Sequence, residues 1–348
     1  MTLFQFRSFE RHWPDLSGTS MLITGGTGSF GRAFARLLLA RSMPRRLVIF
    51  SRDEQKQETM ARDLKAEFPA MADRLRFFIG DVRDVSRLEI AMREIDVVVH
   101  AAALKIVPTA EYNPFECILT NVHGAENVVL ASLRTNVKKV VALSTDKAAN
   151  PVNLYGASKL AADKIMVAAN NYSGSLGVRF SVVRYGNVIG SRGSVLPLFK
   201  DLVSRGAKAM PITDVRMTRF WISVKQGVEF VISSIGLMQG GEIFVPKIPS
   251  MRIVDLARVV APDLPHEIVG IRPGEKLHEV MITDDDARMT LELDDRYVIF
   301  PPHDRWRPDA LKSAGVRPVA EGFRYSSDNN AEWMSSDALD ELMKAGAA

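Results

Sequence analysis

Tyr155 and Lys159 are the residues of this 348-residue chain whose types and spacing point most directly to chemistry. On a helix, residues four positions apart share one face and lie one turn apart. Because a nearby ammonium group favours a phenolate, we expect Lys159 to lower the pKa of Tyr155. Tyr155 is then a competent base toward a hydroxyl group, and the pair predicts proton-transfer chemistry.

A second acid and base stand at Asp146 and Lys147, directly after Thr145 at the end of an apolar run. A carboxyl group beside an amine can supply one group that donates a proton and one that removes a proton. The second role requires a neutral Lys147, and we expect partial burial and the nearby cation Lys159 to depress its pKa. A solvated ion pair at the end of a strand is the alternative interpretation.

Gly25, Gly28 and Gly31 follow the apolar run Met21–Thr24 and lead into a helical pattern over Phe30–Ala40. In such a unit the first glycine permits a tight turn, the second lets the backbone approach a pyrophosphate, and the third allows close helix packing. The helix N-terminus faces the anion. The spacing therefore predicts a dinucleotide-binding loop.

The end of the next apolar run indicates which dinucleotide is bound. Ser51 and Arg52 can receive a 2′-phosphate, which favours NADP over NAD, although Asp53 can still reach the ribose hydroxyls. Asp81 is placed to accept a hydrogen bond from the adenine amino group, or else caps a helix. Besides the glycines, Tyr155 and Lys159, the predicted cofactor contacts include Thr27, Ser29, Phe30, Val82, Ala101 and Ala103.

Short apolar runs alternate with amphipathic stretches through the first half of the chain, the pattern of a parallel sheet covered on both faces. We expect an α/β, doubly wound fold with a smaller C-terminal substrate-binding region. The expected parts are a lead-in segment over 1–18, an NADP-binding domain over 19–187, and a mainly substrate-binding region over 188–348 that can interleave with the domain before it. The expected strands are Met21–Thr24, Leu47–Phe50, Leu75–Ile79, Val97–Ala101, Val140–Ser144 and Ser181–Tyr185. The expected helices are Phe30–Ala40, Gln55–Phe68, Val85–Arg93, Asn121–Thr135, Tyr155–Asn171 and Asp337–Lys344.

Composition and charge exclude several classes of protein. Hydrophobic residues make up 47% and charged residues 25%, as in globular domains. A net charge of +4, spread along the chain, suits a small polyanionic ligand better than a nucleic acid. Cys117 is the single cysteine, so no intramolecular disulfide is possible, and we expect Cys117 in the core of a cytoplasmic protein.

Metal and membrane binding are likewise not expected. His100 and His278 lack partners at metal-ligand spacing. The sequence also has no uninterrupted run of 18 or more apolar residues, which a membrane-spanning helix typically needs.

The glycine loop and the Tyr155–Lys159 pair make the chain resemble the extended short-chain dehydrogenase/reductase family, which implies a Rossmann fold. More narrowly, residues 21–333 resemble the inverting UDP-N-acetylglucosamine 4,6-dehydratases. The motifs that carry this resemblance are Ala101–Lys105, Ser144–Asn150, Arg184–Asn187, Arg216–Trp221, Phe244–Pro249 and Arg272–Glu279.

This resemblance implies a reaction cycle on UDP-N-acetylglucosamine with NADP as a recycled hydride carrier. Tyr155 deprotonates the C4 hydroxyl, which Thr145 orients, and Lys159 holds the nicotinamide ribose. Lys147 removes the C5 proton, and Asp146 releases the C6 hydroxyl as water. The implied product is UDP-2-acetamido-2,6-dideoxy-β-L-arabino-hex-4-ulose, inverted at C5, as the first step of pseudaminic acid synthesis for flagellin or surface glycosylation.

The matching motifs also imply substrate contacts, with Arg219 and Arg272 the favoured donors to the diphosphate. The expected substrate-binding residues are Lys105, Lys147, Asn187, Arg219, Arg272 and Glu275. A UDP-sugar 4-epimerase and a non-catalytic NADP-sensing protein remain alternatives, and Lys147 argues against the epimerase. Relatives of this type commonly associate through helices beside the tyrosine helix, so we expect a homo-oligomer that is a dimer or a multiple of dimers.

Overall fold

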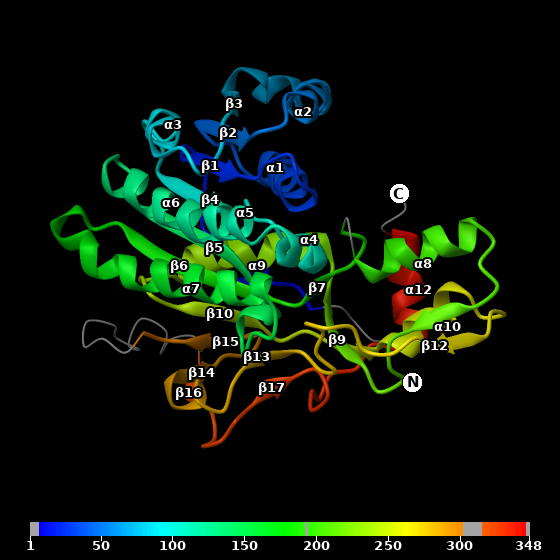
Figure 1. The fold of residues 1–348 in the computed structure, drawn as a ribbon. Helices are drawn as coiled ribbons and strands as arrows, with labels where there is room; N and C mark the ends of the chain where they lie inside the picture. The colour runs from blue at the N-terminus through cyan, green and yellow to red at the C-terminus, as the bar shows by residue number, and fades with distance from the viewer. Residues whose placement is uncertain (1–6, 192–193, 302–314, 346–348) are drawn as a thin grey trace.

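The computed structural model describes residues 7–191, 194–301 and 315–345 (Figure 1). Over these ranges the central feature is a ten-stranded sheet. Its parallel strands are, in spatial order, β3 (Leu75–Ile79), β2 (Arg46–Ser51), β1 (Ser20–Thr24), β4 (Val97–His100), β5 (Lys139–Thr145), β6 (Arg179–Tyr185) and β10 (Ile243–Pro246). The antiparallel strands that extend the sheet beyond β10 are β15 (Arg296–Ile299), β14 (Thr290–Glu292) and β16 (Arg317–Pro318).

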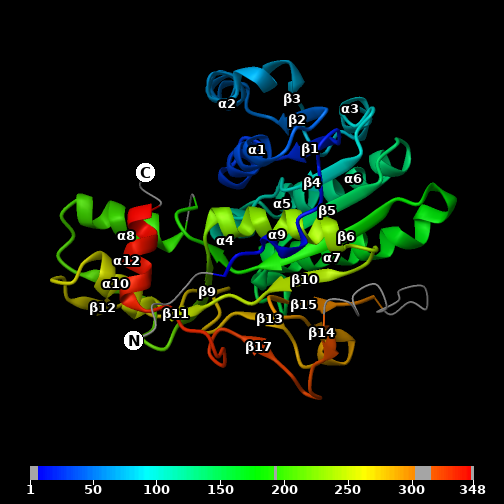
Figure 2. The same cartoon turned by 180° about the vertical axis from the view of Figure 1, so that it is seen from behind.

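Helices cover both faces of this sheet, which is why strands such as β1 are buried along their whole length (Figures 1 and 2). On one face, α3 (Val85–Ala91), α6 (Gly124–Leu133) and α7 (Leu154–Ser173) pack side by side. On the other face, α1 (Ser29–Arg41) packs against α9 (Val224–Leu237). Figure 2 also shows α2 (Glu54–Glu67) beyond α1 at the β3 edge.

The sequence-based prediction of an α/β, doubly wound fold is confirmed. The expected strand Leu47–Phe50 is β2, and the expected helix Gln55–Phe68 is α2 within a residue at each end. The structure adds two short helices between β4 and α6, namely α4 (Val107–Tyr112) and α5 (Pro114–Ile118). A π-helical turn, Leu119–His123, follows α5, so the helix expected over Asn121–Thr135 divides into this turn and α6.

The chain after residue 188 contributes to two places. Part of it, including α9 and β10, returns to the large sheet, and another part builds a smaller lobe with its own hydrophobic core (Figure 1). The small strands are β7 (Asn187–Val188), β8 (Met210–Ile212), β9 (Thr218–Ile222), β11 (Ser250–Arg252), β12 (His266–Ile268), β13 (Val280–Ile282) and β17 (Tyr325–Ser326). The helices of the lobe are α8 (Val195–Ser204), α10 (Ile253–Val260) and α12 (Ser336–Ala345). The boundaries at residues 18 and 187 stay predictions.

The lead-in segment packs against α9. The Phe9 ring is fully buried and meets Phe230 edge-on, with ring centroids 4.9 Å apart. Gly236 lets the backbone of the lead-in segment approach α9 closely, because a Cβ at Gly236 would lie 2.3 Å from the His12 carbonyl oxygen. In the described part of the chain, no helix is both long enough and apolar enough to cross a membrane.

Candidate functional site

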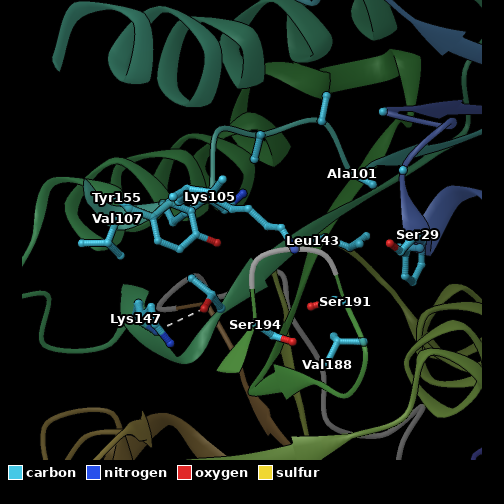
Figure 3. A pocket seen from close by; sticks show the side chains of 18 of the residues that line it. Ser29, Ala101, Lys105, Val107, Leu143, Lys147, Tyr155, Val188, Ser191 and Ser194 are labelled. Carbon is cyan, nitrogen blue, oxygen red and sulfur yellow. Dashed lines mark hydrogen bonds between the residues drawn. The ribbon is translucent and has the colours of Figure 1, made fainter. Parts of the chain in front are cut away.

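A cavity of about 740 Å³ opens at the carboxyl ends of the parallel strands. Gly25 follows β1, Ala101 follows β4, Thr145 ends β5 and Tyr185 ends β6, and all four line the cavity. This is the edge of an open α/β sheet at which ligands generally bind. Figure 3 shows Tyr155 and Lys147 at one end of the cavity and Ser29 at the other.

The structure brings nearly all the predicted site residues together around this one cavity. Those that line it are Gly25, Thr27, Gly28, Ser29, Phe30, Gly31, Ser51, Arg52, Asp53, Asp81, Val82, Ala101, Ala103, Lys105, Thr145, Lys147, Tyr155, Lys159, Asn187, Arg219, Arg272 and Glu275. Asp146 is the exception, because it is fully buried behind the cavity wall.

The glycine loop has the geometry expected of it. Gly25 has a φ of +65°, and a Cβ there would lie 2.9 Å from the backbone of Ala102. A Cβ on Gly31 would lie 2.3 Å from the Gly26 carbonyl oxygen. Gly28 is the N-cap of α1 and offers no side chain to its first amides, so these N–H groups suit an anionic ligand.

At the end of β2, the predicted cofactor residues differ in the contacts that they already make with other protein groups. Asp53 is the N-cap of α2: its carboxylate accepts a hydrogen bond from the Lys56 amide at 2.9 Å and also pairs with the Lys56 ammonium. Arg52 is half-exposed, with Nη1 3.5 Å from Asp81 Oδ2. Both cations, Arg52 and Lys56, line the cavity, and sequence reasoning missed Lys56.

Asp81 is not a helix cap, since Asp84 caps α3. Its carboxylate instead accepts hydrogen bonds from the backbone and guanidinium of Arg83, at 2.7 to 3.0 Å. Burial raises the pKa of Asp81, but these hydrogen bonds outweigh it and hold the pKa below its ordinary value. The predicted contact with adenine stays a prediction.

Tyr155 and Lys159 lie in the first turns of α7, where the Asn153 side chain caps the helix by accepting a hydrogen bond from the Gly156 amide at 2.7 Å. Both residues are buried and line the cavity. Burial raises the pKa of Tyr155 to about 12, and the Lys147 charge and a hydrogen bond with Thr145 offset it only in part. The expectation that Lys159 lowers the pKa of Tyr155 is therefore wrong for this structure.

Asp146 and Lys147 form a 3-10 turn, η4 (Asp146–Ala148), directly after β5. Asp146 Oδ1 accepts hydrogen bonds from Thr145 Oγ1 at 2.9 Å and Lys147 Nζ at 3.1 Å, while Oδ2 is buried without a partner. Burial raises the pKa of Asp146, and Lys147 opposes that shift. A solvated ion pair, the alternative interpretation, does not describe this carboxyl group, which is 0% exposed.

Lys147 has a second carboxylate partner that sequence reasoning missed. Glu279 Oε1 lies 3.0 Å from Lys147 Nζ, and the Glu279 side chain is 2% exposed. Burial lowers the pKa of Lys147, but the charges of Asp146 and Glu279 outweigh it and raise the pKa. The expected depression of this pKa is therefore wrong, because the two carboxylates outweigh burial and the nearby cation, which is Arg219. The long motif Arg272–Glu279 was the signal that could have singled out Glu279.

The predicted substrate-binding residues fall into two groups. Arg219 is held by the protein itself, donating to the carbonyls of Thr218, Lys276 and Leu277 at 2.7 to 3.1 Å. Arg272 is 58% exposed, with Nη1 4.0 Å from Glu275, so it has more freedom to bind a ligand. Lys105 points into the cavity in Figure 3, and Asn187 Oδ1 accepts a hydrogen bond from Lys147 at 3.4 Å.

The loop over 272–279 is fastened to the start of α7. The Gly274 carbonyl accepts a hydrogen bond from Asn153 Nδ2 at 2.8 Å, and Lys276 Nζ donates to the Ala149 carbonyl at 2.5 Å. Residues far apart in the chain thus close one wall of the cavity. Sequence reasoning missed Asn153 and Lys276, because neither contact follows from a local pattern.

Cys117 is buried in the core, as expected. In the parts of the chain that the structure describes, no group of three or more His, Cys, Asp or Glu residues is arranged to hold a metal ion.

The chain matches a known family along most of its length. The family described as polysaccharide biosynthesis protein matches residues 21–301. A curated protein from Campylobacter jejuni, UDP-N-acetylglucosamine 4,6-dehydratase (inverting), is 56% identical over 330 residues, which cover 93% of this chain and 97% of that protein. The resemblance predicted from the sequence is thereby confirmed.

The chain is also similar to a second curated protein and to a solved structure. A UDP-glucose 4-epimerase from Rickettsia canadensis is 41% identical over 287 residues, covering 80% of this chain and 82% of the epimerase. The solved structure of Pen from Bacillus thuringiensis superposes with a TM-score of 0.85 at 34% identity, covering 95% of this chain and 99% of Pen.

Proposed function

Because this chain belongs to the polysaccharide biosynthesis protein family, we propose that it is an inverting UDP-N-acetylglucosamine 4,6-dehydratase, a carbon–oxygen lyase that uses NADP. The observation that carries the proposal is the Asp146–Lys147 pair beside Tyr155, in a chain 56% identical to a protein of that name. An epimerase needs only reversible oxidation at C4, whereas a dehydratase also needs an acid and a base for C5 and C6.

The nucleotide end of the cavity fits a nicotinamide dinucleotide. Gly25 and Gly31 leave no room for side chains, and the uncapped N-terminus of α1 offers amides to the pyrophosphate. Asp53 is engaged as a helix cap, while the cations Arg52 and Lys56 line the ribose end, which supports NADP over NAD. When bound, the cofactor would supply hydride chemistry: it would accept the hydride from C4 and return it to C6 after the elimination, while C5 takes up a proton.

Tyr155 is the base for the C4 hydroxyl in this proposal. Its ring lies in the cavity wall, and Thr145 and Lys147 are the groups that favour its phenolate. Lys159 lies one turn along α7, where its side chain can hold the nicotinamide ribose. Oxidation at C4 makes the C5 proton acidic, which prepares the elimination.

Lys147 then removes the C5 proton, and Asp146 supplies the proton that leaves with the C6 hydroxyl as water. The buried Asp146 suits the acid role, because burial raises its pKa and so favours the protonated carboxyl group. The cavity does not reach this carboxyl, and the Thr145 hydroxyl, 2.9 Å from Oδ1, is the group that connects it to the cavity. A hydroxyl both accepts and donates, so it can pass the proton on.

Proton NMR of the purified protein with UDP-N-acetylglucosamine in deuterated water tests the proposal. We expect a new C6 methyl signal, deuterium at C5, and couplings of an L-arabino 4-keto sugar. A second candidate, a UDP-sugar 4-epimerase, is favoured by the 41% identity to the Rickettsia canadensis protein. It predicts inversion at C4 with an intact C6 hydroxymethyl group. Cofactor binding without turnover of any UDP-sugar would instead indicate a sensor.

The wider setting of the reaction stays a set of predictions. These are entry of the product into pseudaminic acid synthesis, a cytoplasmic location and a homo-oligomeric state.

A further inference from the structure

Two buried carboxylates share the Lys147 amine. Nζ lies 3.1 Å from Asp146 Oδ1 and 3.0 Å from Glu279 Oε1, and the two acidic side chains are 0% and 2% exposed. Nothing in the reaction proposed above uses Glu279, although it lines the cavity. Two carboxylates this close to one cation cannot both ionise freely, because each disfavours the charge of the other.

The surroundings differ between the two carboxylates. Besides Lys147, the charged groups facing Glu279 are Arg219 on β9, with Nε at 3.7 Å, and Lys276 on its own loop, also at 3.7 Å. Within the described residues, Lys147 is the only cation that pairs with Asp146 within 4.0 Å, and each carboxyl group has one oxygen, Asp146 Oδ2 and Glu279 Oε2, buried without a hydrogen-bond partner. Burial raises the pKa of Glu279, but Lys147, Arg219 and Lys276 outweigh it and lower the pKa. Of the two carboxyl groups, Glu279 is thus the one that ionises more readily, and Asp146 is the one that holds a proton more readily.

The backbone of Glu279 is fixed independently of this cluster. Its amide donates to Ser327 Oγ at 2.9 Å, and its carbonyl accepts from the Ser327 amide at 2.8 Å. Ser327 Oγ in turn lies 2.6 Å from Thr218 Oγ1, next to Arg219 on β9, and Thr218 Oγ1 also meets the His278 ring. A change of charge at Glu279 can therefore leave the shape of this wall intact.

We propose that Glu279 is a positioning residue for the elimination step: its ionised carboxylate fixes the place and the protonation state of the Lys147 amine, and so leaves Asp146 free to carry the proton for C6. This inference rests on the proposed dehydratase. Lys147 must lose a proton before it accepts the one from C5, and the negative charge of Glu279 sets the pH at which that happens. The rate of elimination should consequently rise with pH. The position of this rise, the acid limb of the pH–rate profile, is set by loss of the proton from the Lys147 amine.

Glu279→Gln removes the charge and keeps the shape. With one negative charge gone beside the amine, Lys147 loses its proton more easily, and the acid limb of kcat for C5 deuterium exchange moves to lower pH by about one unit or more. KM should change little, because the Glu279 side chain is almost wholly enclosed. Glu279→Asp keeps the charge and should keep the limb at its wild-type position with a reduced kcat.

Glu292→Gln is the matched control, since Glu292 also joins two cations, Lys247 at 2.8 Å and Arg317 at 3.0 Å, but lies away from the cavity. It should leave the acid limb unchanged. If the Glu279→Gln profile overlays that of the wild type, the inference is wrong. Loss of C4 oxidation and C5 exchange in equal proportion at every pH would also overturn it, because that result indicates structural damage alone.

A titration that needs no turnover separates this inference from the proposed function. NMR of protein labelled at lysine Cε follows the Lys147 amine directly, and we expect its titration to move to lower pH in Glu279→Gln. A wild-type protein that dehydrates no UDP-sugar refutes the dehydratase, whatever the lysine titration shows. A wild-type dehydratase whose Lys147 titration is unmoved by Glu279→Gln refutes the inference alone.

Discussion

The backbone carbonyl of Lys147 occupies the space that a side chain on Gly156 would need, because a Cβ at Gly156 would lie 2.2 Å from that oxygen. This close approach sets the η4 turn against the first turn of α7 and fixes Lys147 relative to Tyr155. Gly156→Ala should separate the two elements. Since a displacement of about 1 Å can cost about 100-fold in rate, we expect kcat for dehydration to fall by about that factor.

Gly227→Ala is the control for this substitution. Gly227 is also in a helix, α9, but a Cβ there would meet no atom within 4 Å, and alanine favours helical backbone. It should leave kcat unchanged and raise the free energy of unfolding slightly. Steady-state kinetics and urea unfolding of the two variants check this, and equal kcat values in both would contradict the role given to Gly156.

Lys147→Gln should separate the two halves of the proposed reaction. Tyr155 still deprotonates the C4 hydroxyl, so oxidation at C4 continues, although more slowly because Lys147 no longer favours the phenolate, but the base for C5 is gone. Loss of general-base catalysis typically costs about 100- to 10,000-fold, and we expect a decrease of that size in methyl formation and C5 deuterium exchange. The absorbance of reduced nicotinamide after mixing with substrate measures oxidation at C4, which is the half of the reaction that should survive. Full C5 exchange in this variant would assign the base role elsewhere.

Arg52→Ala tests the choice of cofactor. The Arg52 guanidinium is half-exposed and lines the cavity, and it is the group that we propose binds the 2′-phosphate. A hydrogen bond to a charged group contributes about 1.5–3 kcal/mol, so NADP affinity should fall at least about tenfold while NAD affinity changes little. Calorimetric titration with both dinucleotides gives the ratio. Lys65→Ala, an exposed change on α2, the helix that follows Arg52, should leave that ratio unchanged.

The fold and the cofactor loop could be predicted because their signals are local. Glycine spacing, apolar runs and helical periodicity each occupy a short window, and the structure places Gly25 and Gly31 where only glycine fits. The Asp146–Lys147 pair was equally visible, as neighbours in the chain. The contacts that these two residues make across the cavity could not be predicted from the sequence.

The pKa values were mispredicted for the same reason. The sequence places Lys159 close to Tyr155 and Lys147, but it does not show that burial outweighs the nearby charges at Tyr155. Nor does it show that Glu279, 132 positions after Lys147, arrives beside that amine. Ionisation depends on burial and on long-range neighbours, and both are properties of the folded chain.

His100, at the end of β4, makes the stability of the fold depend on pH. Thr24 Oγ1 accepts from the amides of Ala101 and Ala102 at 3.2 Å, so its own proton goes to His100 Nδ1 at 2.8 Å. His100 Nδ1 must therefore carry no proton, so the imidazole is neutral. Burial, with a smaller contribution from Lys159, lowers the pKa of His100 from 6.5 to about 3.

Because the folded-state pKa of His100 is depressed, the unfolded chain binds a proton between about pH 6.5 and pH 3 that the folded chain does not. The free energy of unfolding should fall as the pH falls through this window, by about 2 kcal/mol from this residue between pH 7 and pH 5. His100→Asn keeps an acceptor for Thr24 but does not titrate. Its free energy of unfolding should therefore fall by about 2 kcal/mol less than that of the wild type over the same pH change. Urea unfolding at the two pH values measures the difference, and His123→Asn, a change at an exposed imidazole, should follow the wild type. If His100→Asn also follows the wild type, the buried imidazole is not the source of the pH dependence.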